Sequence, residues 1–135
     1  MRETSLPLDA APLAALFAAD ENIELVMLFG SAVTSGLRPD SDVDVAVLAR
    51  TPLTAKRKAE MIRAVAEITG RPVDLVDLRG AGVAVTSEIL SRGRRLFERR
   101  AGVFPTLLSR TLADVADFLP YRERILRERR HAWIA

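Results

Sequence analysis

Two aspartates, Asp42 and Asp44, lie two positions apart in the apolar segment SDVDVAVLA. Side chains at this spacing in a β-strand point to the same face, so we expect the two carboxylates to lie side by side. A buried carboxylate is unfavourable unless it is paired or bound to a metal, and carboxylate oxygens suit hard cations such as Mg²⁺. The pattern therefore predicts a site that binds one or two such cations and leaves coordination positions open for phosphate oxygens.

A Gly-Ser pair, Gly30 and Ser31, precedes these aspartates and directly follows the apolar run IELVMLF. Glycine lets the backbone turn tightly and approach a ligand closely. We expect the amide and hydroxyl of Ser31, at the start of a helix, to bind triphosphate oxygens. Together with the two aspartates, the pair indicates in-line displacement at phosphorus.

A third carboxylate would complete such a site, and the segment RPVDLVDL offers two, Asp74 and Asp77. They are three positions apart, so in a strand they point to opposite faces and only one can join the first two aspartates. The third acid could serve as a metal ligand or as a general base toward an attacking hydroxyl. Taken singly, a D-x-D pattern or a Gly-Ser pair is common in plain turns, and it is their combination and order that favour a catalytic site.

The amino-acid composition excludes several classes of catalytic and metal site. The chain has 135 residues, 49% of them hydrophobic and 28% charged, which is typical of one globular domain with its own core. It contains no cysteine and a single histidine, His131, which excludes disulfides and zinc-thiolate sites and argues against Ser-His chemistry. The formal net charge of +2 is too small to indicate direct nucleic-acid binding. No apolar run reaches transmembrane length or resembles the core of a signal peptide, so we expect a soluble cytoplasmic protein with no membrane partner.

The hydrophobic periodicity predicts a small sheet with helical crossovers, an α/β (α+β) fold. We expect one domain over residues 1–135, with a core at about 20–100 and a C-terminal helical extension at about 103–131 that Pro120 kinks or breaks. Strands are predicted over 23–29, 41–49, 71–78 and, at the sheet edge, 94–99, and helices over 10–20, 55–69 and 85–93.

The order of these motifs resembles the signature of the DNA polymerase β-type nucleotidyltransferase superfamily, in which Gly-Ser is followed by D-x-D. The stretch GSAVTSGLRPDSDVDVAVL is similar to minimal nucleotidyltransferase (MNT) domains and to aminoglycoside adenylyltransferases. RPVDLVDL resembles the strand that carries the third acid, and this alignment selects Asp74. Farther along, AGVAVTSEILSRGRRLFER and ADVADFLPYRERILRER resemble segments of MNT antitoxins paired with HEPN toxins, so the resemblance spans about 24–130.

The resemblance implies a nucleotidyltransferase fold with a mixed sheet flanked by helices, and ATP and two Mg²⁺ ions as substrate and cofactors. It further implies transfer of AMP to a tyrosine of a HEPN ribonuclease toxin, which silences the toxin. Asp74 would deprotonate the accepting hydroxyl or complete the metal site. The implied metal and catalytic residues are Asp42, Asp44 and Asp74, and the implied nucleotide-binding residues are Gly30, Ser31 and Ser41.

The shortness of the chain favours a protein acceptor, because only about thirty residues follow Phe104 and they leave little room for an acceptor pocket. Two alternatives remain open. One is an adenylyltransferase of a small hydroxylated molecule such as an aminoglycoside, and the other is a non-catalytic antitoxin that neutralises its partner by binding.

The basic C-terminal segment YRERILRERRHAW also has two interpretations. The simpler one is a solvated helix face. The other is a helix that docks the partner, with Tyr121, Ile125, Leu126 and Trp133 as apolar anchors.

Overall fold

The computed structural model of the chain describes residues 10–33 and 41–134, apart from the side chains of residues 32, 118–123 and 129–134. Every predicted strand and helix in these ranges is present, with ends that differ by a few residues. The elements are α1 (Ala10–Ala18), β1 (Ile23–Phe29), the short 3₁₀ helix η1 (Gly30–Val33), β2 (Val43–Ala49), α2 (Ala55–Thr69), β3 (Val73–Asp77), α3 (Val83–Arg92), β4 (Arg94–Glu98) and α4 (Val103–Ile134).

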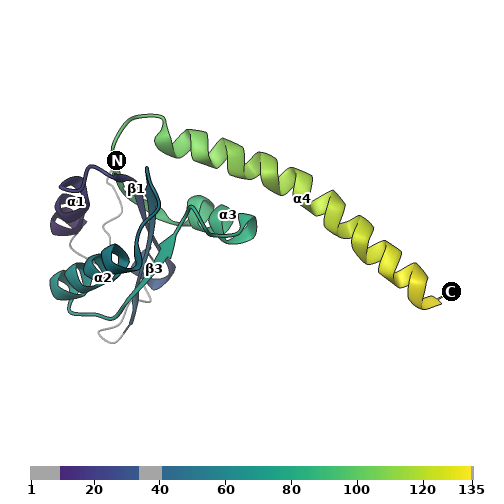
Figure 1. Ribbon diagram of the computed structural model, residues 1–135, viewed down its shortest axis with the longest axis horizontal. Helices are drawn as coiled ribbons and strands as arrows, with labels where there is room; N and C mark the ends of the chain where they lie inside the picture. Colours follow the sequence, from purple (N-terminus) through teal and green to yellow (C-terminus); the bar gives the residue numbers. More distant parts are fainter. Residues whose placement is uncertain (1–9, 34–40, 135) are drawn as a thin grey trace, which may run out of the picture.

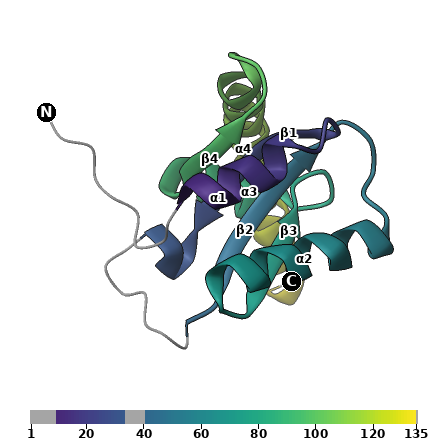
Figure 2. The ribbon, with the colours of Figure 1, turned by 90° about the vertical axis from the view of Figure 1, so that its left-hand side faces the viewer.

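The four strands form one mixed sheet in the order β3-β2-β1-β4. β1 is antiparallel to β2 and β4, whereas β2 and β3 are parallel. α1 and α2 cover one face of the sheet and α3 lies on the other (Figure 1), an arrangement also visible after a quarter turn (Figure 2). The structure confirms the predicted α/β (α+β) class, and it confirms that 94–99 contributes an edge strand.

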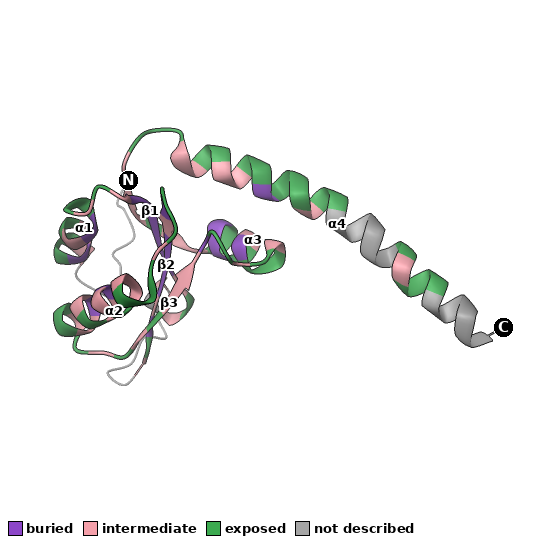
Figure 3. Cartoon of the chain, viewed as in Figure 1, coloured by how far each residue is buried: buried purple, intermediate pink, exposed green. Residues whose placement is uncertain are grey.

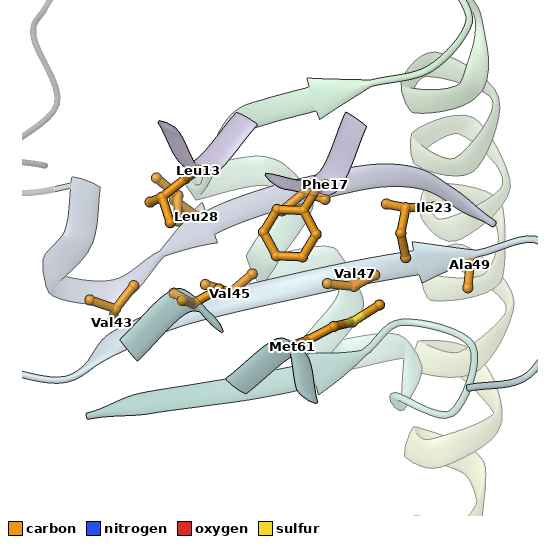
Figure 4. Close-up of a cluster of buried hydrophobic side chains, with 11 residues drawn as sticks. Leu13, Phe17, Ile23, Leu28, Val43, Val45, Val47, Ala49 and Met61 are labelled. Carbon is orange, nitrogen blue, oxygen red and sulfur yellow. The ribbon is translucent and has the colours of Figure 1, made fainter. Parts of the chain in front are cut away.

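Alternation along β2 separates its side chains into two sets, as the period-two pattern predicts. Val43, Val45 and Val47 are buried in the cluster beneath α1 and α2, together with Leu13 and Phe17 of α1 (Figure 4). Ala46 belongs to the opposite cluster, beneath α3. Asp44 is two positions before Ala46, so it lies on the α3 face of the sheet.

A β-bulge near the start of β1 accommodates a buried carboxylate, that of Glu24, in an otherwise apolar strand. The register with β2 shifts between Ile23 and Leu25, which leaves Glu24 in the irregular position. Its side chain is only 7% exposed and forms ion pairs with Arg50, at 3.3 Å, and with Arg100. This buried acid is therefore neutralised, and it ties β1 to the end of β2 and to the turn before α4.

The start of α4 is held by the strand that precedes it. The carboxylate of Glu98 accepts a hydrogen bond from the backbone N–H of Phe104 at 2.8 Å, which satisfies one of the free amides of the first turn. The guanidinium of Arg95 lies over the Phe104 ring at 4.6 Å and donates to Glu98 at 3.1 Å. These contacts fix the direction in which α4 leaves the sheet.

Of the two effects predicted for Pro120, a kink or a break, the break is wrong, since α4 runs without interruption from Val103 to Ile134. A proline removes one helical hydrogen bond and crowds one carbonyl, a cost of about 3 kcal/mol. Ala113 and Ala116 before it, and the Arg- and Glu-rich sequence after it, favour helix strongly enough for the helix to continue. Among the residues described, no helix combines the length and apolar character needed to span a membrane.

Candidate active site

Two of the predicted site residues are direct neighbours across the sheet. Asp44 of β2 and Asp74 of β3 are register partners in the parallel pair, on strands about 4.8 Å apart. Asp42 stands one residue before β2, two positions from Asp44. The ladder reaches this point, because the N–H of Val43 donates to the carbonyl of Pro72 at 2.8 Å. The structure thus brings Asp42, Asp44 and Asp74 together.

Asp77 lies on the other face, as its three-residue offset from Asp74 predicts. Its Oδ2 is 3.7 Å from Nζ of Lys58, a residue of α2. The carboxylate of Asp77 therefore pairs with a helix on the far side of the sheet and does not join the other three.

The three carboxylates leave negative charge without compensation. Burial, followed by the charges of Asp74 and Asp42, raises the pKa of Asp44 above its ordinary value. Within the described part of the chain, no lysine or arginine forms an ion pair with any of the three. Unlike Glu24, which two arginines neutralise, this cluster is a site that a cation would stabilise.

The donor set fits Mg²⁺. All three candidate ligands are carboxylates, the hard oxygen donors that Mg²⁺ prefers. Across residues 10–33 and 41–134, no group of three or more acidic or histidine side chains has the geometry of a complete metal site. That too suits Mg²⁺, which is commonly held by one or two carboxylates and completes its octahedron with water and substrate phosphate. Asp42 and Asp44 are the residues that would hold it, with Asp74 beside them.

The Gly-Ser turn lies directly against these acids. Gly30 has φ of +65°, a left-handed conformation that favours glycine. A β-carbon added there would overlap Oδ2 of Asp44 and lie 3.3 Å from its Cγ. Ser31 Oγ donates to the backbone carbonyl of Asp42 at 3.4 Å, and the half-buried Ser41 immediately precedes that aspartate. Gly30, Ser31 and Ser41 therefore border the carboxylate cluster.

A cleft of about 430 Å³ opens beside the turn, between η1 and α3. Its size lies within the range of small-molecule sites. Two charged residues of α3, Glu88 and Arg92, stand at its edge, and no motif in the sequence points to either of them. The residues that line it are Phe29, Gly30, Ser31, Val33, Glu88, Ile89 and Arg92.

Comparison with known proteins agrees with this geometry. The model of the family described as "Polymerase beta, Nucleotidyltransferase" matches residues 12–101, a range that contains the Gly-Ser turn and all three carboxylates. The chain belongs to this nucleotidyltransferase family. The relationship predicted from the motifs is thereby confirmed.

A curated relative of the chain is named as an adenylyltransferase. The protein adenylyltransferase MntA of Shewanella oneidensis is 33% identical over 75 residues, which are 56% of this chain and 54% of MntA. The chain thus spans about half the length of this curated relative.

Solved structures share the nucleotidyltransferase fold. A toxin–antitoxin crystal structure with AMP-PNP has a TM-score of 0.79 at 24% identity, covering 90% of this chain and 98% of the compared one. A tri-AMPylated Shewanella oneidensis HEPN toxin in complex with its MNT antitoxin gives a TM-score of 0.71 at 23% identity, with coverages of 88% and 93%. At these identities the likeness establishes the fold.

The close contact at Gly30 leads to a prediction for this nucleotidyltransferase. In the Gly30→Ala variant the new β-carbon would overlap the carboxylate of Asp44 and should push it aside. We expect binding of Mg²⁺ and AMP-PNP to fall by at least about tenfold, as for a lost charge-assisted interaction. Isothermal titration calorimetry would measure both affinities.

Gly70→Ala is a matched control. Gly70 also has a left-handed φ, of +68°, but nothing lies within 4 Å of an added β-carbon. Both variants should lose about 1–2 kcal/mol of unfolding free energy from the strained backbone. Only Gly30→Ala should lose ligand binding, and equal affinities in the two variants would contradict the role given to the contact.

Proposed function

We propose that this protein is an Mg²⁺-dependent adenylyltransferase that moves AMP from ATP to a tyrosine hydroxyl of a HEPN ribonuclease toxin and thereby acts as its antitoxin. One observation carries the proposal above the others. In the described part of the chain, three carboxylates without a cationic partner gather beside a glycine-serine turn. This is the arrangement needed to hold a metal-bound triphosphate for in-line displacement.

The transfer forms one bond and breaks one. The tyrosine oxygen attacks the α-phosphorus of ATP, the bond from that phosphorus to the oxygen bridging the β-phosphate breaks, and pyrophosphate leaves with the bonding electrons. The tyrosine proton must be accepted as the new bond forms. Asp74 is exposed on the edge strand β3, so a hydroxyl brought by a second protein can reach it. It therefore acts as the base or completes the metal site.

The remaining residues bind and orient the nucleotide. The backbone around Gly30 and the hydroxyls of Ser31 and Ser41 face the triphosphate, as oriented donors do in phosphate sites. Asp42 and Asp44 would hold Mg²⁺, which would supply positive charge to the phosphate oxygens and to the leaving pyrophosphate. Positioning and charge stabilisation account for most of such catalysis.

A protein acceptor is supported by what surrounds the site. The cleft beside Gly30 measures about 430 Å³, near the lower end of the range for small-molecule sites, which leaves little room for an acceptor beside a nucleotide. The similar solved structures include a HEPN toxin in complex with an MNT antitoxin. The long α4 projects away from the sheet and offers a surface for such a partner (Figure 1).

Intact mass spectrometry of the product of the neighbouring reading frame tests the proposal, which expects that product to be a HEPN protein. After incubation with this protein, ATP and Mg²⁺, we expect the HEPN mass to increase by one or more AMP units at a tyrosine. The double variant Asp42→Asn, Asp44→Asn removes both metal-holding carboxylates and should transfer none, while its circular dichroism spectrum stays that of the wild type.

Each other outcome points to a different function. No mass gain, with Mg²⁺-dependent nucleotide binding intact, would favour a small hydroxylated acceptor. Neutralisation of the toxin by the double variant would favour an antitoxin that acts by binding alone. A mass gain that persists in the double variant would show that these carboxylates are not the catalytic ones.

A further inference from the structure

The cleft beside the Gly-Ser turn has a cationic residue on its wall. Arg92, the last residue of α3, lines it together with Gly30 and Ser31. Among the described residues, no other lysine or arginine lines this cleft. Arg92 therefore stands across the cleft from the backbone that would meet a triphosphate.

We infer that Arg92 binds the terminal, β- and γ-phosphates of the nucleotide, and that Glu88 holds its guanidinium in place until the nucleotide enters. The inference rests on the proposed adenylyltransferase function and adds a specific nucleotide-binding residue to it. It concerns the end of the triphosphate that departs as pyrophosphate.

The charge of the carboxylate cluster next to the Gly-Ser turn supports this assignment. Asp42, Asp44 and Asp74 carry negative charge near the α-phosphate side, and a triphosphate adds more. A cation on this wall would offset the charge of the phosphates that lie farthest from the carboxylates.

Arg92 forms an ion pair with Glu88, and this pair is weak enough to be replaced by a phosphate group. Arg92 Nε lies 3.1 Å from Glu88 Oε2, one helical turn earlier, and the two side chains are 80% and 66% exposed. Water screens such a pair, so it contributes little stability. A planar guanidinium donates several hydrogen bonds at once to phosphate oxygens, which makes phosphate the stronger partner.

Nucleotide titrations of four proteins test the inference: wild type, Arg92→Ala, Glu88→Gln and Arg63→Ala. Arg63 is an exposed arginine of α2, on the far face of the sheet, and serves as the matched control. Affinity for AMP-PNP with Mg²⁺ is measured by calorimetry, and affinity for AMP by displacement of a fluorescent nucleotide. AMP lacks the phosphates that Arg92 is inferred to bind.

For Arg92→Ala we expect AMP-PNP binding to weaken about 10- to 100-fold, the range for a lost charge-assisted hydrogen bond, with AMP binding unchanged. Glu88→Gln removes the competing partner and should strengthen AMP-PNP binding about two- to threefold, as for release of a weak exposed pair. Arg63→Ala should match the wild type for both ligands.

Two results would overturn the inference alone: unchanged AMP-PNP affinity in Arg92→Ala, or an equal loss for AMP-PNP and AMP. Both presuppose a wild type that binds AMP-PNP. A wild type that fails to bind AMP-PNP in the presence of Mg²⁺ would instead overturn the proposed function, and this inference with it.

Discussion

Replacement of Asp74 by asparagine should lower the rate of AMP transfer by about 100-fold or more, the usual effect of losing a catalytic base or a metal-holding carboxylate. The same replacement at Asp77 should change the rate by no more than about twofold, because that side chain pairs with Lys58 on the opposite face of the sheet. The measurement is the initial rate of AMP incorporation into the HEPN partner by intact mass.

The electrostatics of the site provide a second readout. The charge of Asp74 is one cause of the raised pKa of Asp44, after burial. Asp74→Asn should therefore lower the pKa of Asp44, whereas Asp77→Asn should leave it in place. A raised carboxyl pKa stabilises the fold below the unfolded-state pKa, and that contribution is lost as pH rises through the folded-state value. NMR titration of the Asp44 carboxyl carbon, without metal, would measure the shift.

Mg²⁺ dependence distinguishes the two possible roles of Asp74. If it completes the metal site, Asp74→Asn should require a higher Mg²⁺ concentration for half-maximal rate. If it is the base, the Mg²⁺ requirement should stay the same while the rate falls. Equal activities of the asparagine variants at 74 and 77 would contradict either role and the choice of Asp74 as third acid.

The carboxylate cluster could be predicted because each step toward it is local. Period-two alternation aligns Asp42 with Asp44, and a three-residue offset separates Asp74 from Asp77. The only long-range requirement is that β2 and β3 be neighbours, which a short strand–helix–strand unit favours. The resemblance to the nucleotidyltransferase superfamily supplied the choice between the two later acids.

Other features depend on packing that no local pattern encodes. Glu24 stands within an apolar run, and only the β-bulge aims it between two arginines. The sequence around Arg92 is that of an ordinary solvent-exposed helix end. Arg92 borders the cleft because α3 lies beside η1. Pro120 signals a helix break by itself, yet the helix-forming residues around it outweigh its cost.

The C-terminal part of α4 needs an explanation of its own. The first turns pack on the sheet through Val103, Phe104, Leu107 and Leu108, and Thr111 is buried. Beyond them the helix extends away from the sheet, and its described side chains are exposed or half-buried (Figure 3). Most helical stability in proteins comes from tertiary packing, which this part of α4 lacks on its described side chains, so a partner that covers it would stabilise it.

Two leucines mark the face that such a partner would cover. Leu112 and Leu126 are 49% and 47% exposed, and their separation of two heptads places them on the same side of the helix. Half-buried Val115, three residues after Leu112, lies near the same stripe. Exposed apolar residues in this register are typical of a helix that docks on another helical protein. Of the anchors expected from the sequence, Tyr121 and Trp133 have side chains outside the described ones.

The double variant Leu112→Glu, Leu126→Glu should therefore bind the HEPN partner at least about 30-fold more weakly, the effect of losing a central apolar contact. AMP transfer to the proposed partner should fall in proportion at low partner concentration and recover when the partner is in excess, because the proposed catalytic residues lie on other elements. Calorimetry of complex formation and intact mass of the partner provide the two measurements.

Ala113→Glu introduces the same charge on a neighbouring, exposed position of α4 and serves as the control. It should bind the partner as the wild type does, because position 113 is rotated about 100° from the leucine stripe. Mg²⁺-dependent AMP-PNP binding should be unchanged in both variants, which separates docking from nucleotide binding. If the double variant and the control formed the complex equally well, the partner would have to bind the sheet domain instead, and exposure of the two leucines would have no part in recognition.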